Sequence, residues 1–356
     1  MKIRFFLISQ IVLLFNISLF ADDEENKPLS VLIIGGGPAG LATAIEAETL
    51  GCTVTIVEKR KEHSRFQPVI IKEYSLKLLK KWNTTIPEMT VFDIPTEHNG
   101  EAQAGLVQIR FLEKGLEKKI KELQIKRIQG EFQGFGPDQS ALIVIFEKER
   151  LQIPYDIIIG ADGAHSCVRE ALAIKKKLFA SAVGAWAIIP KLTKELVEPA
   201  VSPTIRVDDG FYRIYKDLRG SAVFIQFPLC ASKDQIKRSL ETQGMIKEAR
   251  SVEKGYALIF EQFPILLDQV QAFSNEEKSA ILIGDSAALS SFLVGNGANT
   301  AFKSAEIAGF FLKEIQISRK TAFQNFNQSM KEETDKLIEA NSFLFGLDYV
   351  AGNSAS

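Results

Sequence analysis

Short apolar runs that end in glycines or in an acidic residue dominate the first part of the chain. Ser30–Ile34 (SVLII) is an apolar run followed by glycines, which is typical of a buried parallel strand. Gly40–Leu50 has the small and apolar residues of a helix packed on that strand. Cys52–Arg60 contains a second strand, which ends at the acidic residue Glu58. Together these segments predict one βαβ unit of about 30 residues.

Both helical and strand periodicities follow. Glu73–Trp82 and Gln108–Leu123 have apolar residues at helical spacing. Strands are predicted near Ile125–Phe132 and Ala141–Glu147, with a glycine-containing turn between them. Tyr155–Gly163 (YDIIIGADG) is a further buried strand that runs into glycines.

From about residue 176 the pattern changes to β-rich pieces separated by turns, which predicts an antiparallel sheet inserted into the first domain. Ser279–Asp285 (SAILIGD) returns to the parallel-strand style. Helices are predicted over Asn299–Gln316 and from about Thr321 to Phe345. The expected fold is α/β: a Rossmann-type domain with a parallel sheet (28–175 and 277–356), an inserted antiparallel sheet (176–276) and a helical C-terminus.

The N-terminal segment has the layout of a secretory signal. Lys2 and Arg4 precede the apolar stretch Phe5–Phe20, which is shorter than the roughly 20 residues of a membrane-spanning helix. Ala21 and an acidic cluster follow, so we expect a signal peptide over residues 1–21 and export to the periplasm or medium. The alternative is an uncleaved segment that anchors the chain in a membrane.

Composition narrows the function classes. The net charge of the 356 residues is −1, so no overall field attracts nucleic acid. The three histidines (His63, His98, His165) and three cysteines (Cys52, Cys167, Cys230) are scattered singly, which disfavours a metal site. We expect a small-molecule substrate; the oligomeric state is not predicted.

The glycine-rich turn after the first strand has a definite chemical meaning. Gly35, Gly37 and Gly40 form G-x-G-x-x-G, with Pro38 and Ala39 inside it. This pattern lets a diphosphate approach the N-terminus of the following helix. Glu58, with Lys59 beside it, ends the second strand about 20 residues further on, where a carboxylate accepts hydrogen bonds from a ribose.

Two later motifs resemble those of the flavin-dependent aromatic hydroxylases, the group A monooxygenases with the para-hydroxybenzoate hydroxylase fold. GADGAHSCVR contains the family's Asp-Gly-x-x-Ser-x-x-Arg, which begins with Asp162 and Gly163. GDSAALSSFLVGNGANT matches the Gly-Asp motif at Asp285, followed by Gly-x-Gly-x-Asn. The resemblance covers about residues 30–345. It implies that Asp162 and Gly163 lie near the FAD diphosphate, that Asp285 binds the ribityl chain or a phosphate, and that the loop of Gly295, Gly297, Ala298 and Asn299 faces the flavin.

Further positions match family features. Arg65, in the loop after Glu58, resembles a basic contact of the cofactor, and Arg110 resembles a helix residue that touches the flavin. Two positions depart from the family pattern: Ala288 stands where the family has histidine, and Phe292 where it has proline. Trp186, Phe224 and Phe227 of the inserted sheet are candidates to line a substrate site, but core packing is the favoured interpretation of each.

The resemblance implies a monooxygenase that uses FAD, with NAD(P)H as a transient co-substrate. In this family a flavin C4a-hydroperoxide oxygenates the substrate, here expected to be small and apolar or aromatic. No side chain is predicted to be catalytic. Two alternatives remain open: an FAD-dependent reductase or dehydrogenase of a lipid-like substrate, as in the geranylgeranyl reductases, and an exported FAD-binding protein without turnover.

Overall fold

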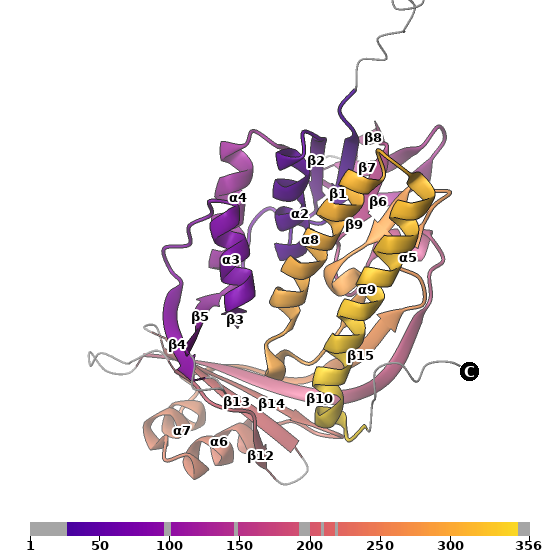
Figure 1. The fold of residues 1–356 in the computed structure, drawn as a ribbon. Helices are drawn as coiled ribbons and strands as arrows, with labels where there is room; N and C mark the ends of the chain where they lie inside the picture. Colours follow the sequence, from indigo (N-terminus) through magenta and orange to yellow (C-terminus); the bar gives the residue numbers. More distant parts are fainter. Residues whose placement is uncertain are drawn as a thin grey trace, which may run out of the picture.

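The computed structural model describes residues 27–95, 101–145, 149–191, 200–207, 210–217 and 220–347. The predicted signal segment and His98 lie outside these residues. A nucleotide-binding α/β body and a second sheet below it form the two main parts of the chain (Figure 1). Within the described residues, no helix is long and apolar enough to cross a membrane.

The first body contains an eight-stranded sheet of order β16-β17-β9-β1-β2-β6-β7-β8. Its central strand β1 pairs in parallel with β2 and β9, and β17 pairs in parallel with β9. The parallel strands β1, β9 and β17 are short, apolar and buried, as is typical of a sheet with helices on both faces. Their bounds are β1 Ser30–Ile34, β2 Thr53–Glu58, β6 Lys126–Gly136, β7 Ser140–Ile145, β8 Arg150–Pro154, β9 Ile157–Gly160, β16 Ser274–Asn275 and β17 Ala280–Leu282.

Five helices belong to this body, and the pairs α2–α8 and α8–α9 pack against each other. Aromatic edge-to-face contacts reinforce the packing on α8: Phe311 of α8 contacts Phe323 of α9, and Trp82, at the C-terminal end of α3 (Glu73–Lys81), contacts Phe302 of α8. Four of these five helices were predicted and are present with small shifts at their ends, whereas the short helix α5 was not predicted. Their bounds are α2 Pro38–Thr49, α4 Ile109–Glu122, α5 Cys167–Ala171, α8 Gly297–Glu314 and α9 Arg319–Ser342.

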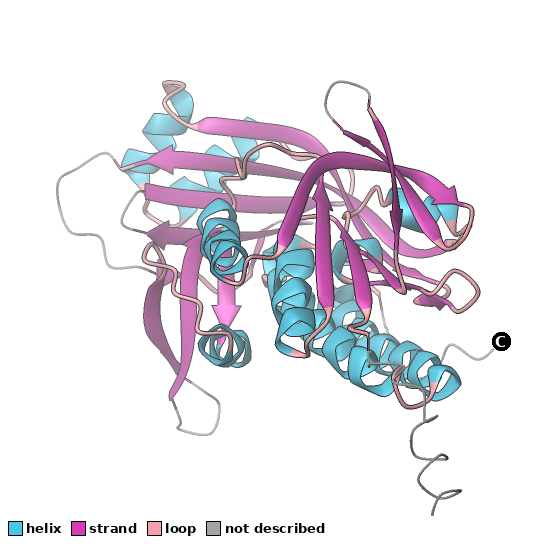
Figure 2. Cartoon of the chain, turned by 90° about the horizontal axis from the view of Figure 1, so that it is seen from above, coloured by secondary structure: helices cyan, strands magenta, loops and turns pink. Residues whose placement is uncertain are grey.

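The second body is the predicted antiparallel sheet, of order β11-β13-β14-β10-β15-β18, with β12 paired to β13. Its long strands β10 and β15 pair along most of their length and curve across the molecule (Figure 2). The bounds are β10 Lys176–Pro190, β11 Ala200–Val201, β12 Ile205–Val207, β13 Gly210–Asp217, β14 Gly220–Phe227, β15 Leu258–Val270 and β18 Ala288–Leu289.

Besides α5, two larger parts of the architecture were not predicted. Helices α6 (Lys233–Thr242) and α7 (Ile246–Glu253) cover the outer face of the second sheet and bury only one narrow apolar side. A small sheet of order β3-β5-β4 leads to helix α3 (Glu73–Lys81), which was predicted. The strands of this small sheet are β3 Pro68–Lys72, β4 Thr90–Pro95 and β5 Glu101–Gln108.

Candidate cofactor and substrate site

The glycine turn after β1 places the N-terminus of α2 against a cavity. Gly35 has φ +113°, a conformation that glycine adopts without strain, and its N–H donates to the Val57 carbonyl at 2.8 Å. A Cβ on Gly40 would overlap the carbonyl oxygen of Gly35, so this glycine lets α2 pack closely on β1. Helix α2 begins at Pro38, and its first N–H groups have no partner inside the helix.

Glu58 closes one side of this turn. Its Oε2 accepts the Gly36 N–H at 2.6 Å, and its Oε1 accepts the Arg60 N–H and Nε–H at 2.7 and 3.1 Å. Burial alone would raise the pKa of Glu58, but the hydrogen bonds and charge of Arg60 outweigh it, so the pKa is lowered. Glu58 is therefore an ionised acceptor at the cavity wall.

Asp162 and Gly163 follow β9 and form the opposite wall. Asp162 Oδ2 accepts the N–H groups of Cys167 and Val168 at 2.7 and 3.2 Å, so this carboxylate caps the first turn of α5. Burial raises the pKa of Asp162 despite these bonds. Gly163 has φ +87°, and a Cβ there would meet nothing within 4 Å, so its backbone faces open space.

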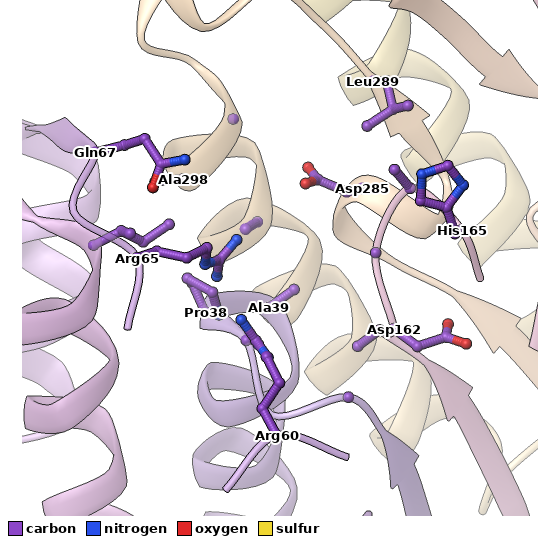
Figure 3. Close-up of a pocket in the computed structure, with 18 of the residues that line it drawn as sticks. Pro38, Ala39, Arg60, Arg65, Gln67, Asp162, His165, Asp285, Leu289 and Ala298 are labelled. Atoms are coloured by element: carbon purple, nitrogen blue, oxygen red, sulfur yellow. The ribbon is translucent and has the colours of Figure 1, made fainter. Parts of the chain in front are cut away.

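Asp285 lies in a 3-10 turn, Gly284–Ser286, directly after β17. Figure 3 shows its carboxylate pointing into the cavity toward the guanidinium of Arg65. Asp285 is an exposed residue and lines this cavity. Burial raises the pKa of this carboxyl, and the positive charges of Arg65 and Lys176 oppose that shift only in part.

The loop from Ser290 to Asn296 connects β18 to α8, which begins at Gly297. Gly295 follows a second 3-10 turn, Phe292–Val294, and has φ +69°. Asn299 does not line the main cavity: its amide donates to the Ile70 and Gly295 carbonyls, and its Oδ1 accepts from Lys72 N–H and Ser75 Oγ–H. These hydrogen bonds attach the start of α8 to β3 and α3. Asn299 was predicted to face the flavin, but in the structure its side chain is used to hold these elements together.

These elements surround one cavity of about 830 Å³. Of the predicted cofactor-binding residues, Gly40, Arg110 and Asn299 are not among its lining. Arg110 instead has its guanidinium over the rings of Phe66 and Phe111, at 4.2 and 4.6 Å. The predicted residues that line the cavity are Gly35, Gly37, Pro38, Ala39, Glu58, Lys59, Arg65, Asp162, Gly163, Asp285, Gly295, Gly297 and Ala298.

A charged network beneath the loop 59–67 was not predicted. Arg65 pairs with the fully buried Glu113 of α4, which also lies 3.3 Å from His63 Nδ1. Burial alone would lower the pKa of His63, but Glu113 and Glu117 raise it to about 8. Arg60, two residues after Glu58, also lines the cavity, and that spacing was the only sequence signal for it.

Aromatic side chains of the second sheet form the other end of the cavity. Trp186 stacks on Phe260 with ring centroids 4.1 Å apart and lies 5.8 Å from Phe224. Phe292, the residue at the family's proline position, packs between Phe224 and Phe263 at 4.8 and 5.3 Å.

Phe227 and His165 were also considered from the sequence. Phe227 does not line the site: as its core-packing interpretation expects, its ring packs among the buried residues of the opposite face, under α6 and α7. His165 is an exposed turn residue, as expected, and it also lines the cavity beside Asp285 (Figure 3).

The geometry fits FAD. A Cβ on Gly37 would meet only Arg65 Nη2, at 3.8 Å, and one on Gly297 would meet nothing within 4 Å. Gly37 directly precedes α2 and Gly297 is the first residue of α8. The N-termini of both helices therefore face open space, as the binding of an anionic ligand requires. The cavity volume lies within the roughly 300–1,000 Å³ of known ligand pockets.

Comparison with known proteins agrees with this reading. Residues 29–176 match the pyridine nucleotide-disulphide oxidoreductase family model. The FAD-dependent monooxygenase OpS4 of Beauveria bassiana (strain ARSEF 2860) is 23% identical over 337 residues, covering 81% of this chain and 78% of that protein.

Solved structures show the same fold. 2-Methyl-3-hydroxypyridine-5-carboxylic acid oxygenase superimposes with a TM-score of 0.68 and 18% identity, covering 93% of this chain and 95% of the other. PqsL of Pseudomonas aeruginosa, described as a probable FAD-dependent monooxygenase, gives 0.68 and 14%, covering 88% and 94%. The predicted fold class and the predicted resemblance are confirmed.

Proposed function

The chain is an FAD-dependent oxidoreductase, and we propose that it oxygenates a small, uncharged, apolar or aromatic substrate with NAD(P)H and O₂. Its flavin monooxygenase fold is the starting point of this proposal. One observation supports this most directly. A single cavity joins the diphosphate-binding turn at Gly37 to an aromatic wall at Trp186 and Phe224. Cofactor and substrate would therefore share one enclosed space.

FAD supplies the redox chemistry, accepting two electrons from NAD(P)H and activating O₂. The N-terminus of α2 would hold the diphosphate, and Glu58 would accept hydrogen bonds from the ribose. Asp285 would accept hydrogen bonds from the ribityl hydroxyls. The N-terminus of α8, which begins at Gly297, would stabilise negative charge at the flavin edge.

The substrate class follows from the charges around the cavity. Every ionisable residue that lines it comes from the nucleotide-binding body. The second sheet contributes only uncharged apolar side chains to the lining: the aromatic rings of Trp186, Phe224, Phe260 and Phe263, and Leu289 of β18. Such a wall excludes water and stacks on flat apolar molecules, but it offers no cation to a carboxylate.

The test uses the purified full chain. We expect a flavin absorption spectrum, bleaching by NADH or NADPH without air, and ¹⁸O from ¹⁸O₂ in an uncharged aromatic compound. A protein that binds no FAD after reconstitution would refute the whole proposal. Reduction followed by hydrogen addition to the substrate, without ¹⁸O, would instead establish the reductase alternative.

We also propose that the chain is exported. The support is the order of charges in the first 25 residues: basic before the apolar stretch and acidic after it. Sequencing the N-terminus of the protein from the extracytoplasmic fraction should give a start just after Ala21. A full-length, membrane-bound product would support the anchored alternative.

A further inference from the structure

The loop that faces the proposed flavin site is attached to the second sheet by an arginine. Arg213 lies on β13, and its Nη1 donates to the carbonyls of Leu293 and Val294 at 2.8 and 3.2 Å. Its Nε donates to the Ser202 carbonyl at 3.0 Å. One side chain thus satisfies carbonyl groups at the end of the Phe292–Val294 turn, directly before Gly295.

Strand register places this arginine beside the aromatic wall. In the β13–β14 pair Arg213 lies directly opposite Phe224, which lines the cavity. Residues opposite each other in an antiparallel pair project from the same face of the sheet. The face that presents aromatic rings to the substrate region therefore also holds the turn that precedes α8.

A second contact acts at the same turn. Gln226, two residues after Phe224 on β14, is buried; its Oε1 accepts the Ser291 hydroxyl at 2.6 Å and its amide donates to the Leu344 carbonyl at 2.9 Å. Arg213 and Gln226 therefore hold the loop at both ends of its 3-10 turn. Neither side chain lines the cavity, so each would act through the backbone that it holds.

We propose that Arg213 is a positioning residue: it sets the distance between the flavin-facing end of α8 and the aromatic wall of the sheet, and so tunes the bound flavin. This rests on the proposed FAD site. The guanidinium bridges two parts of the chain with several N–H groups in a planar fork, which the single ammonium of lysine cannot reproduce. Its positive charge and the aligned N-terminus of α8 favour reduced over oxidised flavin.

The test compares Arg213→Met and Arg213→Lys with Arg206→Met, a control at an exposed arginine on the neighbouring strand β12. For R213M we expect FAD binding to weaken about tenfold or more, as for loss of a charged hydrogen bond. We also expect the two-electron midpoint potential to fall by about 30 mV for each tenfold loss in the affinity ratio of reduced to oxidised FAD. R213K should lie between R213M and wild type, and R206M should match wild type.

Several outcomes would overturn the inference. Wild-type FAD affinity and potential in R213M, with only a lower melting temperature, would leave Arg213 a purely structural residue. Equal shifts in R213M and R206M would indicate a general charge effect. If R213M does not fold, R213K decides, because unchanged affinity and potential there refute the positioning role. Failure of the wild type to bind FAD would refute the proposed function itself, and with it this inference.

Discussion

Substituting Gly37 by alanine should separate folding from cofactor binding. Gly37 has φ −83° and ψ −176°, which alanine adopts without strain, and the added Cβ would meet only Arg65 Nη2, at 3.8 Å. The fold should therefore lose only the difference between glycine and alanine at a helix N-cap, about 1 kcal/mol or less. The same methyl group projects into the space proposed for the diphosphate. Losing even one charged hydrogen bond there costs about 1.5–3 kcal/mol, or about ten- to a hundredfold in affinity.

Gly40→Ala is the matched contrast, three residues along the same turn. Its Cβ would overlap the Gly35 carbonyl oxygen and lie 3.3 Å from Ile33 Cγ2, so α2 must move away from β1. Overpacking of this kind costs about 1–3 kcal/mol of stability. Chemical denaturation of the apoproteins and FAD titration by fluorescence quenching measure both quantities. Wild-type FAD affinity in G37A would refute the placement of the diphosphate at α2.

Three further predictions follow from the charges and rings of the cavity. Asp285→Asn removes a carboxylate that would accept charge-assisted hydrogen bonds from the ribityl hydroxyls, so it should weaken FAD binding, as FAD titrations would show. The pKa of His63 is raised from 6.5 to about 8, so the stability that its charged form contributes is complete below pH 6.5 and is lost as pH rises through 8. The difference in melting temperature between wild type and His63→Gln should therefore fall over this pH range, and a difference that does not change with pH would contradict the assignment. Phe260→Ala removes a ring that is 40% exposed and stacks on Trp186, so it should cost about 1 kcal/mol of stability. It should leave FAD affinity unchanged but weaken the binding of uncharged aromatic compounds to the FAD-loaded protein.

The parts of the site that are local in sequence could be predicted. The turn Gly35–Gly40 follows from one strand, one helix and the conformations that only glycine adopts easily there. Asp162 and Asp285 were placed by motifs at strand ends, and both line the cavity. The strand periodicity could also have excluded Phe227: it is three residues from Phe224, and odd separations on one strand put side chains on opposite faces.

Other features depend on contacts between distant segments. Arg213 holds residues 80 positions away, and nothing in the sequence near it indicates this. The strands of the β3-β5-β4 sheet lack strong apolar alternation, and β3 and β4 are held together only by their pairing with β5. Helices α6 and α7 are short and largely polar, so their apolar stripe becomes visible only once the outer face of the second sheet requires a cover.

The late position of β17 in the chain has a consequence for biosynthesis. This strand, Ala280–Leu282, pairs with β9, which is complete about 120 residues earlier on the chain. Until β17 emerges from the ribosome, the backbone N–H and C=O groups along one edge of the apolar strand β9 have no strand partner. Asp285 is also not yet present to complete the cavity. A nascent or truncated chain that ends before residue 280 would expose an edge prone to aggregation. Cofactor loading is therefore an event that follows synthesis of nearly the whole chain.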